Sequence, residues 1–284
     1  MHRTIRNLLL VAVVLGAATA TIGLDPNSAR AYHTYEERLL DNTAYSLHRR
    51  RARLGLMKLS YGVIDQLQVT TYTMPYVLGT LFEDIAPNLE LKSTVYDQRR
   101  LALSGSLGFV TGRIEQIDST KIRYLTFPIS LAASVRINSR VNTHLGGQYT
   151  ATKIVGGSEP SDTDIEGAAV VDLLQLWGMV EWRLSKVTAF TFTVRWVPYV
   201  SDTVVRGNLV VDPGNPTIGI GLEIELLDLT HAYSLVPGFV FSWERANIRL
   251  GAGYGSFPID GVGLVVPGSV LNYVSPEFDI FVRF

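Results

Sequence analysis

Histidine and serine side chains are the first candidates for chemistry in this sequence. His33, His48, His144 and His231 lie beyond residue 31, and His231 comes three residues before Ser234. A serine nucleophile needs a histidine base, and the base needs a third group that orients it. No carboxylate or amide stands at a spacing that would orient this pair, so we expect His231 to be a loop residue near a turn. A catalytic site is not expected, and a lipid hydrolase stays open as the least favoured alternative.

The composition excludes several other classes of protein. The chain contains no cysteine, which rules out thiol catalysis, thiolate metal sites and disulfide bonds. Its histidines and carboxylates form no cluster with the spacing of metal ligands, so we expect neither a metal nor a cofactor. A formal net charge of −1 provides no basic field for nucleic acid, which is not expected as a partner.

Charged residues make up only 18% of the 284 residues. Many of them occupy alternate positions in stretches whose intervening residues are apolar, so the charged and apolar side chains would point to opposite faces of a strand. So many charges cannot face lipid, where one Arg or Lys at the bilayer midplane costs about 2–4 kcal/mol. We therefore predict that they line an interior that is filled with water or neutralised by mutual pairing. The residues predicted to line this lumen are Glu90, Lys92, Arg136, His144, Glu181, Arg183, Arg195, Glu223, Glu225 and Arg249.

The elements that would position these charges are β-strands. Residues 125–137 carry apolar side chains at every odd position, with mostly small or polar residues between them. After a polar turn at 138–140, residues 141–152 repeat this alternation. A period of two is typical of strands with two different faces. Beyond residue 31 no stretch approaches the roughly 18 continuous apolar residues of a membrane-spanning helix.

The connections between the expected strands alternate between short and long. Brief turns are expected near 61–66, 97–100, 138–140, 185–187 and 244–247, and long loops near 75–88, 112–122, 155–166 and 256–274. This asymmetry is typical of a transmembrane β-barrel. A closed barrel is also the sheet that satisfies every backbone polar group inside a membrane. The sequence therefore predicts an all-β fold, a transmembrane antiparallel up-and-down β-barrel.

A secreted β-sandwich or a soluble lipocalin-like barrel would alternate in the same way. Periodicity alone does not tell which face points inward. We favour lipid on the apolar face because most strands have about 9–13 residues, which is enough for a tilted span. The opposite face, rich in glycine and charges, would also make a poor soluble core.

The N-terminus predicts export. Arg3 and Arg6 precede an apolar run at 8–24, and Ala29-Arg30-Ala31 supplies the small residues that signal peptidase requires. We expect residues 1–31 to be a cleaved signal peptide, 32–50 a periplasmic N-terminal segment and 51–284 the barrel. An uncleaved N-terminal anchor helix is the alternative.

The C-terminus resembles the last strand of Gram-negative outer-membrane β-barrel proteins. In that family the final residue is aromatic and apolar residues recur at alternate positions before it, and Phe278, Ile280, Val282 and Phe284 match this spacing. The resemblance implies that this strand is read by the barrel-assembly machinery, and it implies the outer membrane as the location. Outer-membrane lipids and the assembly machinery are then the expected partners. Residues 42–47, 54–56 and 61–69 also look like the opening hairpin of poorly characterised, porin-like members, a likeness that names no substrate.

The number of strands follows less directly from the pattern. Thirteen segments alternate, whereas single-chain bacterial barrels have even numbers of strands. If 203–212 belongs to a loop, twelve strands remain, and an extra strand around 43–49 would make fourteen. We predict twelve strands, with fourteen as the alternative.

A polar lumen inside an outer-membrane barrel favours a channel or transporter for the passive passage of small solutes. The charges on the inner face have both signs, so no strong ion selectivity is expected. The first alternative is a non-conducting structural or adhesion barrel whose interior is filled by paired charges. The second is the outer-membrane lipid hydrolase.

Overall fold

The computed structural model describes residues 42–73, 75–76, 87–98, 100–115, 120–158, 164–201, 205–210, 218–222, 231–243, 245–259, 264–266 and 273–284. The expected signal peptide, residues 1–31, lies outside this part of the chain. So do two of the predicted lumen residues, Glu223 and Glu225. In the described ranges no helix has the length and apolar character needed to cross a membrane.

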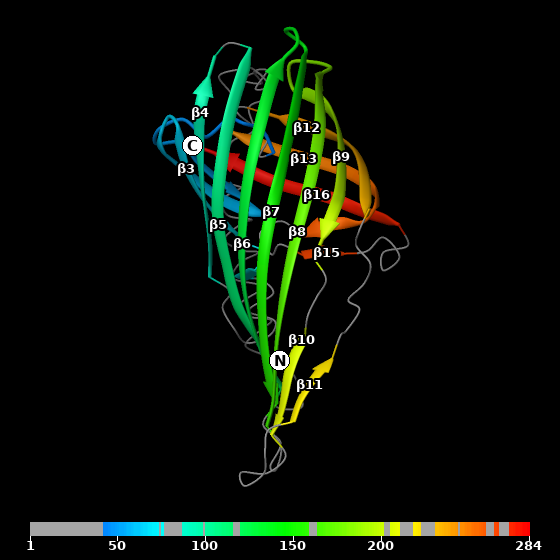
Figure 1. The fold of residues 1–284 in the computed structure, drawn as a ribbon. Helices are drawn as coiled ribbons and strands as arrows, with labels where there is room; N and C mark the ends of the chain where they lie inside the picture. Colours follow the sequence, from blue (N-terminus) through cyan, green and yellow to red (C-terminus); the bar gives the residue numbers. More distant parts are fainter. Residues whose placement is uncertain are drawn as a thin grey trace, which may run out of the picture.

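Within the described residues, twelve antiparallel strands form a closed barrel (Figure 1). Strands that follow one another around the wall pair along it, and the pairings β1–β16 and β8–β9 close the ring. The predicted all-β transmembrane-type barrel of twelve strands is confirmed. The wall strands are β1 (Ala52–Gly55), β2 (Lys58–Ile64), β3 (Leu67–Tyr72), β4 (Asn88–Asp97), β5 (Leu101–Glu115), β6 (Thr120–Arg136), β7 (Val141–Ser158), β8 (Asp164–Arg183), β9 (Thr188–Val200), β12 (Tyr233–Ser242), β13 (Ala246–Gly255) and β16 (Val274–Arg283).

The count of twelve arises differently from the way the sequence suggested. The first of the thirteen alternating segments, residues 51–60, predicts a single strand. The structure has two strands there, β1 and β2, joined by a tight turn at Leu56 and Met57. Residues 61–64, expected in a turn, belong to β2. The segment at 203–212 does form a strand, β10 (Val205–Val210), and it pairs with β11 (Ile218–Leu222). β9 pairs with β8 only at residues 173–183, and β10 pairs with the other end of β8, at residues 164–168. β10 and β11 therefore lie outside the closed ring.

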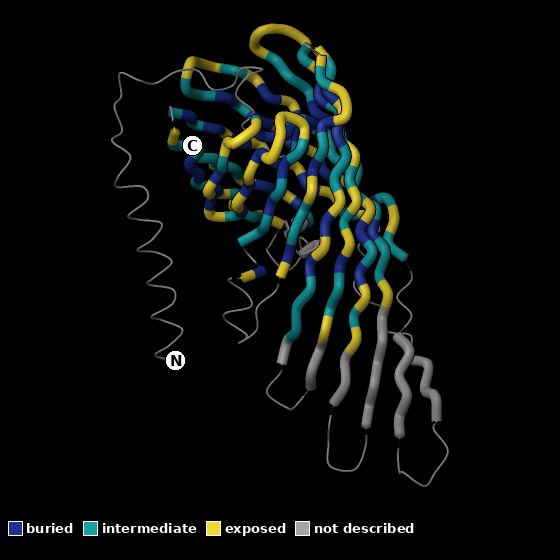
Figure 2. The backbone as a smooth tube through the Cα atoms, turned by 90° about the vertical axis from the view of Figure 1, so that its left-hand side faces the viewer, coloured by how far each residue is buried: buried dark blue, intermediate teal, exposed yellow. Residues whose placement is uncertain are grey.

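The apolar face of the wall points outward. Along β9, Phe192, Val194 and Trp196 are exposed, whereas Thr193 and Arg195 between them are buried. Figure 2 shows the same alternation of buried and exposed residues along the neighbouring strands. A soluble protein would place the apolar row in its core, so the β-sandwich and lipocalin-like alternatives are wrong. An exterior of large apolar side chains around a closed sheet fits hydrocarbon as the surrounding solvent.

The wall is much taller on one side than on the other. Strands β5 to β8 have 15, 17, 18 and 20 residues, whereas β1, β2 and β3 have 4, 7 and 6. A tilted span needs about 9–11 residues. The four long strands therefore continue beyond the membrane at the end where the long connections lie. In Figure 1 the pair β10–β11 lies at this end, and β14 (Phe257–Ile259) with β15 (Leu264–Val266) forms a separate small sheet.

Candidate functional site

The interior of the barrel is the candidate site, because the polar side chains of all wall strands meet there. Eight of the predicted lumen residues are described, and each shares the inward parity of its strand. They differ in exposure: Lys92, His144, Glu181 and Arg195 are buried, while Glu90, Arg136, Arg183 and Arg249 are half-buried.

Residues 42–50 lie inside the wall at the end with the short turns. The backbone N–H of Ala44 donates to Ser134 Oγ on β6 at 2.7 Å, and that of Ser46 donates to Thr94 Oγ1 on β4 at 2.9 Å. The N–H of Leu47 donates to a third wall residue, Gln68 Oε1 on β3, at 2.8 Å. Side chains that face inward from three strands therefore hold this segment, whose residues Thr43, Ala44 and Ser46 are at most 3% exposed.

A glycine in the wall makes room for this inner segment. Gly62 faces inward on β2, and a Cβ atom at this position would lie 2.1 Å from the carbonyl oxygen of His48. The backbone N–H of Arg50 donates to the Gly62 carbonyl at 2.8 Å, and Gly62 donates to Arg51 at 2.9 Å. The segment was expected in the periplasm as part of 32–50, and nothing in its composition indicated that it docks against the wall. The signal that could have suggested this docking is Gly62, because a glycine within a strand often marks a place where another backbone approaches closely.

A polar cluster surrounds the point where Ala44 docks. Ser134 Oγ lies 2.8 Å from His144 Nδ1, and His144 Nε2 lies 3.6 Å from Glu181 Oε2. Asn142 Nδ2 donates to the same carboxylate oxygen at 3.0 Å. Serine, histidine and carboxylate thus come together on β6, β7 and β8. The serine oxygen is 0% exposed and already accepts the N–H of Ala44, so it has no access to a substrate, and this cluster positions the inner segment.

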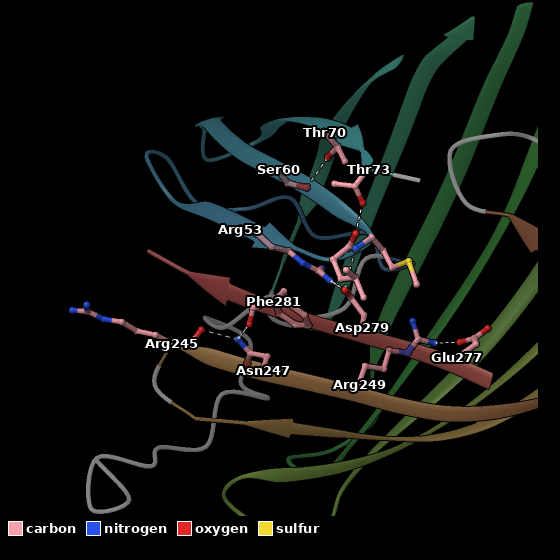
Figure 3. A network of polar contacts seen from close by, with 12 residues as sticks. Arg53, Ser60, Thr70, Thr73, Arg245, Asn247, Arg249, Glu277, Asp279 and Phe281 are labelled. Carbon is pink, nitrogen blue, oxygen red and sulfur yellow. Dashed lines mark hydrogen bonds and ion pairs between the residues drawn. The ribbon is translucent and has the colours of Figure 1, made fainter. Parts of the chain in front are cut away.

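A second cluster links β9, β13 and β16. Glu277 on β16 accepts a hydrogen bond from Arg195 Nη1 on β9 at 2.7 Å and another from Arg249 Nη2 on β13 at 3.0 Å. Figure 3 shows Glu277 with Arg249. Arg195 reaches across two strands to do so. The intervening inner face carries Gly238 and Gly251, where a Cβ atom would come within 3.2 Å of Thr191 Oγ1 and 3.4 Å of Glu277 Cβ respectively. Side chains at these positions would occupy the space between the arginine and the carboxylate.

The seam between the first and last strands carries a buried ion pair. Arg53 Nη2 on β1 donates to Asp279 Oδ2 on β16 at 2.6 Å, and both side chains are nearly inaccessible. The guanidinium carbon of Arg53 also lies 3.7 Å from the ring centre of Phe281, which faces inward (Figure 3). Nearby, Lys58 Nζ lies 5.5 Å from the ring centre of Tyr72, whose hydroxyl donates to Glu90. The prediction of lumen residues omitted Arg53, Lys58 and Glu277, although all three have inward parity once the strand boundaries are known.

The strand expected to be the assembly signal forms part of the closed wall. Phe278 and Phe284 are exposed on the outer face, Ile280 is half-buried, and Val282 is 5% exposed. Phe284 and Ala52 exchange two backbone hydrogen bonds of 3.0 and 3.2 Å. The last residue therefore joins the end of the chain to the first strand.

The serine and histidine considered for hydrolysis do not meet. His231 is exposed and stacks on Trp196, which points out of the wall, with ring centres 6.4 Å apart. Ser234 faces inward and is 0% exposed. The two side chains therefore lie on opposite faces of the sheet. In the described part of the chain no three His, Asp or Glu residues are placed to hold a metal ion.

A closed ring of twelve strands, an apolar exterior and a charged interior together decide the fold. It is that of an outer-membrane β-barrel.

Known proteins resemble this chain in fold only. No protein-family model matches the sequence, and no curated protein matches it. Among solved structures, the translocator domain of the autotransporter NalP from Neisseria meningitidis is similar over 82% of this chain and 85% of its own, with a TM-score of 0.42 and 9% identity. At this identity the likeness concerns the fold alone.

Two other barrels are less similar. CdiB from Acinetobacter baumannii is similar over 84% of this chain, with a TM-score of 0.31 and 10% identity, and the match spans 61% of CdiB. LpxR from Salmonella typhimurium is similar over 75% of this chain and 93% of its own, with a TM-score of 0.29 and 7% identity.

Proposed function

We propose that the protein is a narrow passage for small polar solutes in the outer membrane of a Gram-negative bacterium. The observation that carries the proposal is the inner segment 42–50, which lies against an otherwise polar lumen lined by charges of both signs. A purely structural barrel would not need polar and charged side chains lining the lumen around this segment. The segment is the constriction of the passage, and it lies at the end with the short turns.

The placement in the cell belongs to the same proposal. Residues 1–31 act as a cleaved signal peptide, and the strand that ends at Phe284 is read by the barrel-assembly machinery. The short turns then face the periplasm and the long connections face the outside, as is general for such barrels. Recovery in the outer-membrane fraction, with a heat-dependent shift on gels, supports this placement. Recovery as a soluble periplasmic protein contradicts it.

Conductance in planar bilayers tests the passage. The purified chain without residues 1–31 is compared with Gly62→Ala, in which the added methyl group collides with the His48 carbonyl and displaces the inner segment. We expect small, brief openings for the unchanged chain and a several-fold larger conductance for Gly62→Ala. Gly105→Ala is the matched control, because its new methyl group would meet its nearest neighbour at an ordinary 3.5 Å.

A non-conducting structural or adhesion barrel is the second candidate, and one observation favours it. Inward-facing residues on β7, β9 and β12 are also closed to solvent, among them Thr150, Thr191, Ser234, Val236 and Val240, each at most 1% exposed. If neither the unchanged chain nor Gly62→Ala conducts while both are folded, the passage is wrong and the structural barrel is the better description.

A further inference from the structure

The end of the barrel with the short turns carries a ring of basic side chains. In the part of the chain that the structure describes, four of the five hairpin turns at this end present one exposed basic residue each: Arg100 between β4 and β5, Arg140 between β6 and β7, Lys186 between β8 and β9, and Arg245 between β12 and β13. At the fifth, between β2 and β3, the backbone N–H of Arg49 donates to Asp65, and Arg49, Arg50 and Arg51 pass beside the turn. We call these seven residues the basic ring.

Backbone hydrogen bonds place these turns at one level around the circumference. The Arg100 carbonyl accepts from Arg136 at 2.8 Å, the Arg140 carbonyl accepts from Arg183 at 2.8 Å, and the Arg245 carbonyl accepts from Arg283 at 2.9 Å. Each turn is thus tied to the end of the next strand in the wall. Figure 3 shows the Arg245 side chain extending away from the strands at this end.

Among the residues that the structure describes, no carboxylate neutralises the charges of the basic ring by an ion pair. None of its seven side chains forms an ion pair with another residue of the described ranges. In the described residues of these turns and of 48–51, seven basic side chains face two carboxylates: Asp65, which lies 3.6 Å from His48, and Asp97 at the end of β4. The ring is therefore a zone of strong positive charge on a chain whose formal net charge is −1.

Large apolar side chains lie directly beside the basic ring. Val95 is 73% exposed next to the turn of Arg100, Ile137 is 60% exposed next to that of Arg140, and Leu184 is 51% exposed next to Lys186. A basic residue at the edge of an apolar belt extends its charged end into the headgroup layer while its stem stays near the hydrocarbon. A soluble acidic partner would need charges gathered on one side, whereas a lipid leaflet meets the barrel around its whole circumference.

We propose that the basic ring binds the phosphate groups of anionic phospholipids in the leaflet at this end of the barrel. The proposal rests on the membrane placement given above and goes beyond it by naming the lipid class. A basic side chain near an anionic membrane surface is worth about a fivefold gain in binding. A ring with one such residue at nearly every turn should select phosphatidylglycerol over phosphatidylcholine from a mixed bilayer.

Lipid selection by the reconstituted protein tests the proposal. The full chain without residues 1–31 is placed in vesicles of phosphatidylcholine with a minor share of phosphatidylglycerol, and spin-labelled lipids report the relative association of the two classes. We expect a preference of about fivefold or more for phosphatidylglycerol. It should fall to near unity in the variant with Arg100→Gln, Arg140→Gln, Lys186→Gln and Arg245→Gln, and it should weaken as salt is added.

Matched controls keep the outcome interpretable. A variant with Arg100→Lys, Arg140→Lys and Arg245→Lys keeps every charge and should keep the preference. A heat-dependent gel shift checks that each variant is folded. Inorganic phosphate should weaken the preference no more than sodium chloride at the same ionic strength. A clearly larger loss with phosphate would mean that the ring takes free phosphate.

An equal association of both lipids with the unchanged chain overturns the proposal, and an acidic protein partner then becomes the better explanation of the ring. A preference that survives the four Gln substitutions overturns it as well. Because vesicles do not depend on cellular location, these results are independent of whether the chain is recovered from the outer membrane.

Discussion

Glu277 shows how a single carboxylate joins distant parts of the wall. It binds arginines from β9 and β13 while itself belonging to β16, and Arg195 is almost fully buried. The sequence could predict that Arg195 and Arg249 face inward, because parity along a strand fixes the face. It could not predict their shared partner. That depends on the register between strands and on the space above Gly238 and Gly251, neither of which the alternation reveals.

Removing the Glu277 charge should therefore destabilise the barrel. Glu277→Gln leaves two inward arginines without their carboxylate, and we expect a loss of about 2 kcal/mol, reduced from the value for fully buried pairs because the carboxyl is part-exposed. Urea unfolding followed by the gel shift measures it. Asp65→Asn removes a carboxylate from an exposed pair and should change the unfolding midpoint little. Equal effects of the two variants would contradict the role given to Glu277.

The final aromatic residue leads to a second prediction for a single position. Phe284 is exposed on the outer face and bonds to Ala52, whereas Phe281 faces inward beneath Arg53. If the assembly machinery reads the outward residues of this strand, as proposed above, Phe284→Ser should lower the amount of protein in the outer membrane several-fold. Phe281→Leu, on the other face, should assemble normally and lower only stability. The two effects are separated by comparing membrane levels with unfolding midpoints, and normal levels of Phe284→Ser would contradict the assembly signal.

At the scale of elements, alternation predicted most strands within a few residues. The failures have physical causes. The turn at Leu56 and Met57 contains no glycine or proline to mark it, so β1 and β2 looked like one strand. Residues 216–226 alternate as wall strands do, whereas 203–212 alternate only weakly, which favours a loop. Both segments nevertheless contribute strands to the same sheet, with β11 paired to β10 and β10 paired to β8. β10 lies outside the ring because β9 ends before it covers the whole of β8. The local alternation of a segment does not reveal where another strand ends.

Glycines in the long strands make room for aromatic rings, and this leads to a prediction for β7 and β8. Gly146 and Trp177 are directly paired, and a Cβ atom on Gly146 would lie 2.2 Å from the indole ring. Gly146→Ala must therefore displace Trp177 inside the lumen, at a cost of about 1–3 kcal/mol. The unfolding midpoint and the tryptophan fluorescence should both change. Gly105→Ala, which has space for its methyl group, should change neither, and a neutral Gly146→Ala would show that the ring does not lie over the glycine.

At the scale of the whole molecule, the positions of the charges are more informative about binding than the net charge. From the net charge of −1 no nucleic-acid partner is expected, yet this sum conceals the basic ring at one end. The wall divides the chain into three environments: an apolar exterior, an interior with paired charges and a basic rim. Sequence periodicity predicted the first two, because they are properties of single strands. The rim became visible only when closure brought the short turns to one level.

In the placement proposed above, the wall spans the outer membrane with its short turns facing the periplasm. Because the chain has no cysteine, single cysteines report this directly. Ser139→Cys lies in the turn between β6 and β7, and Lys153→Cys lies on the exposed part of β7 toward the other end. A large maleimide that cannot enter intact cells should label Lys153→Cys on whole cells and label Ser139→Cys only after the cells are broken. Labelling of Ser139→Cys on intact cells, or recovery of both variants as soluble protein, would contradict the account.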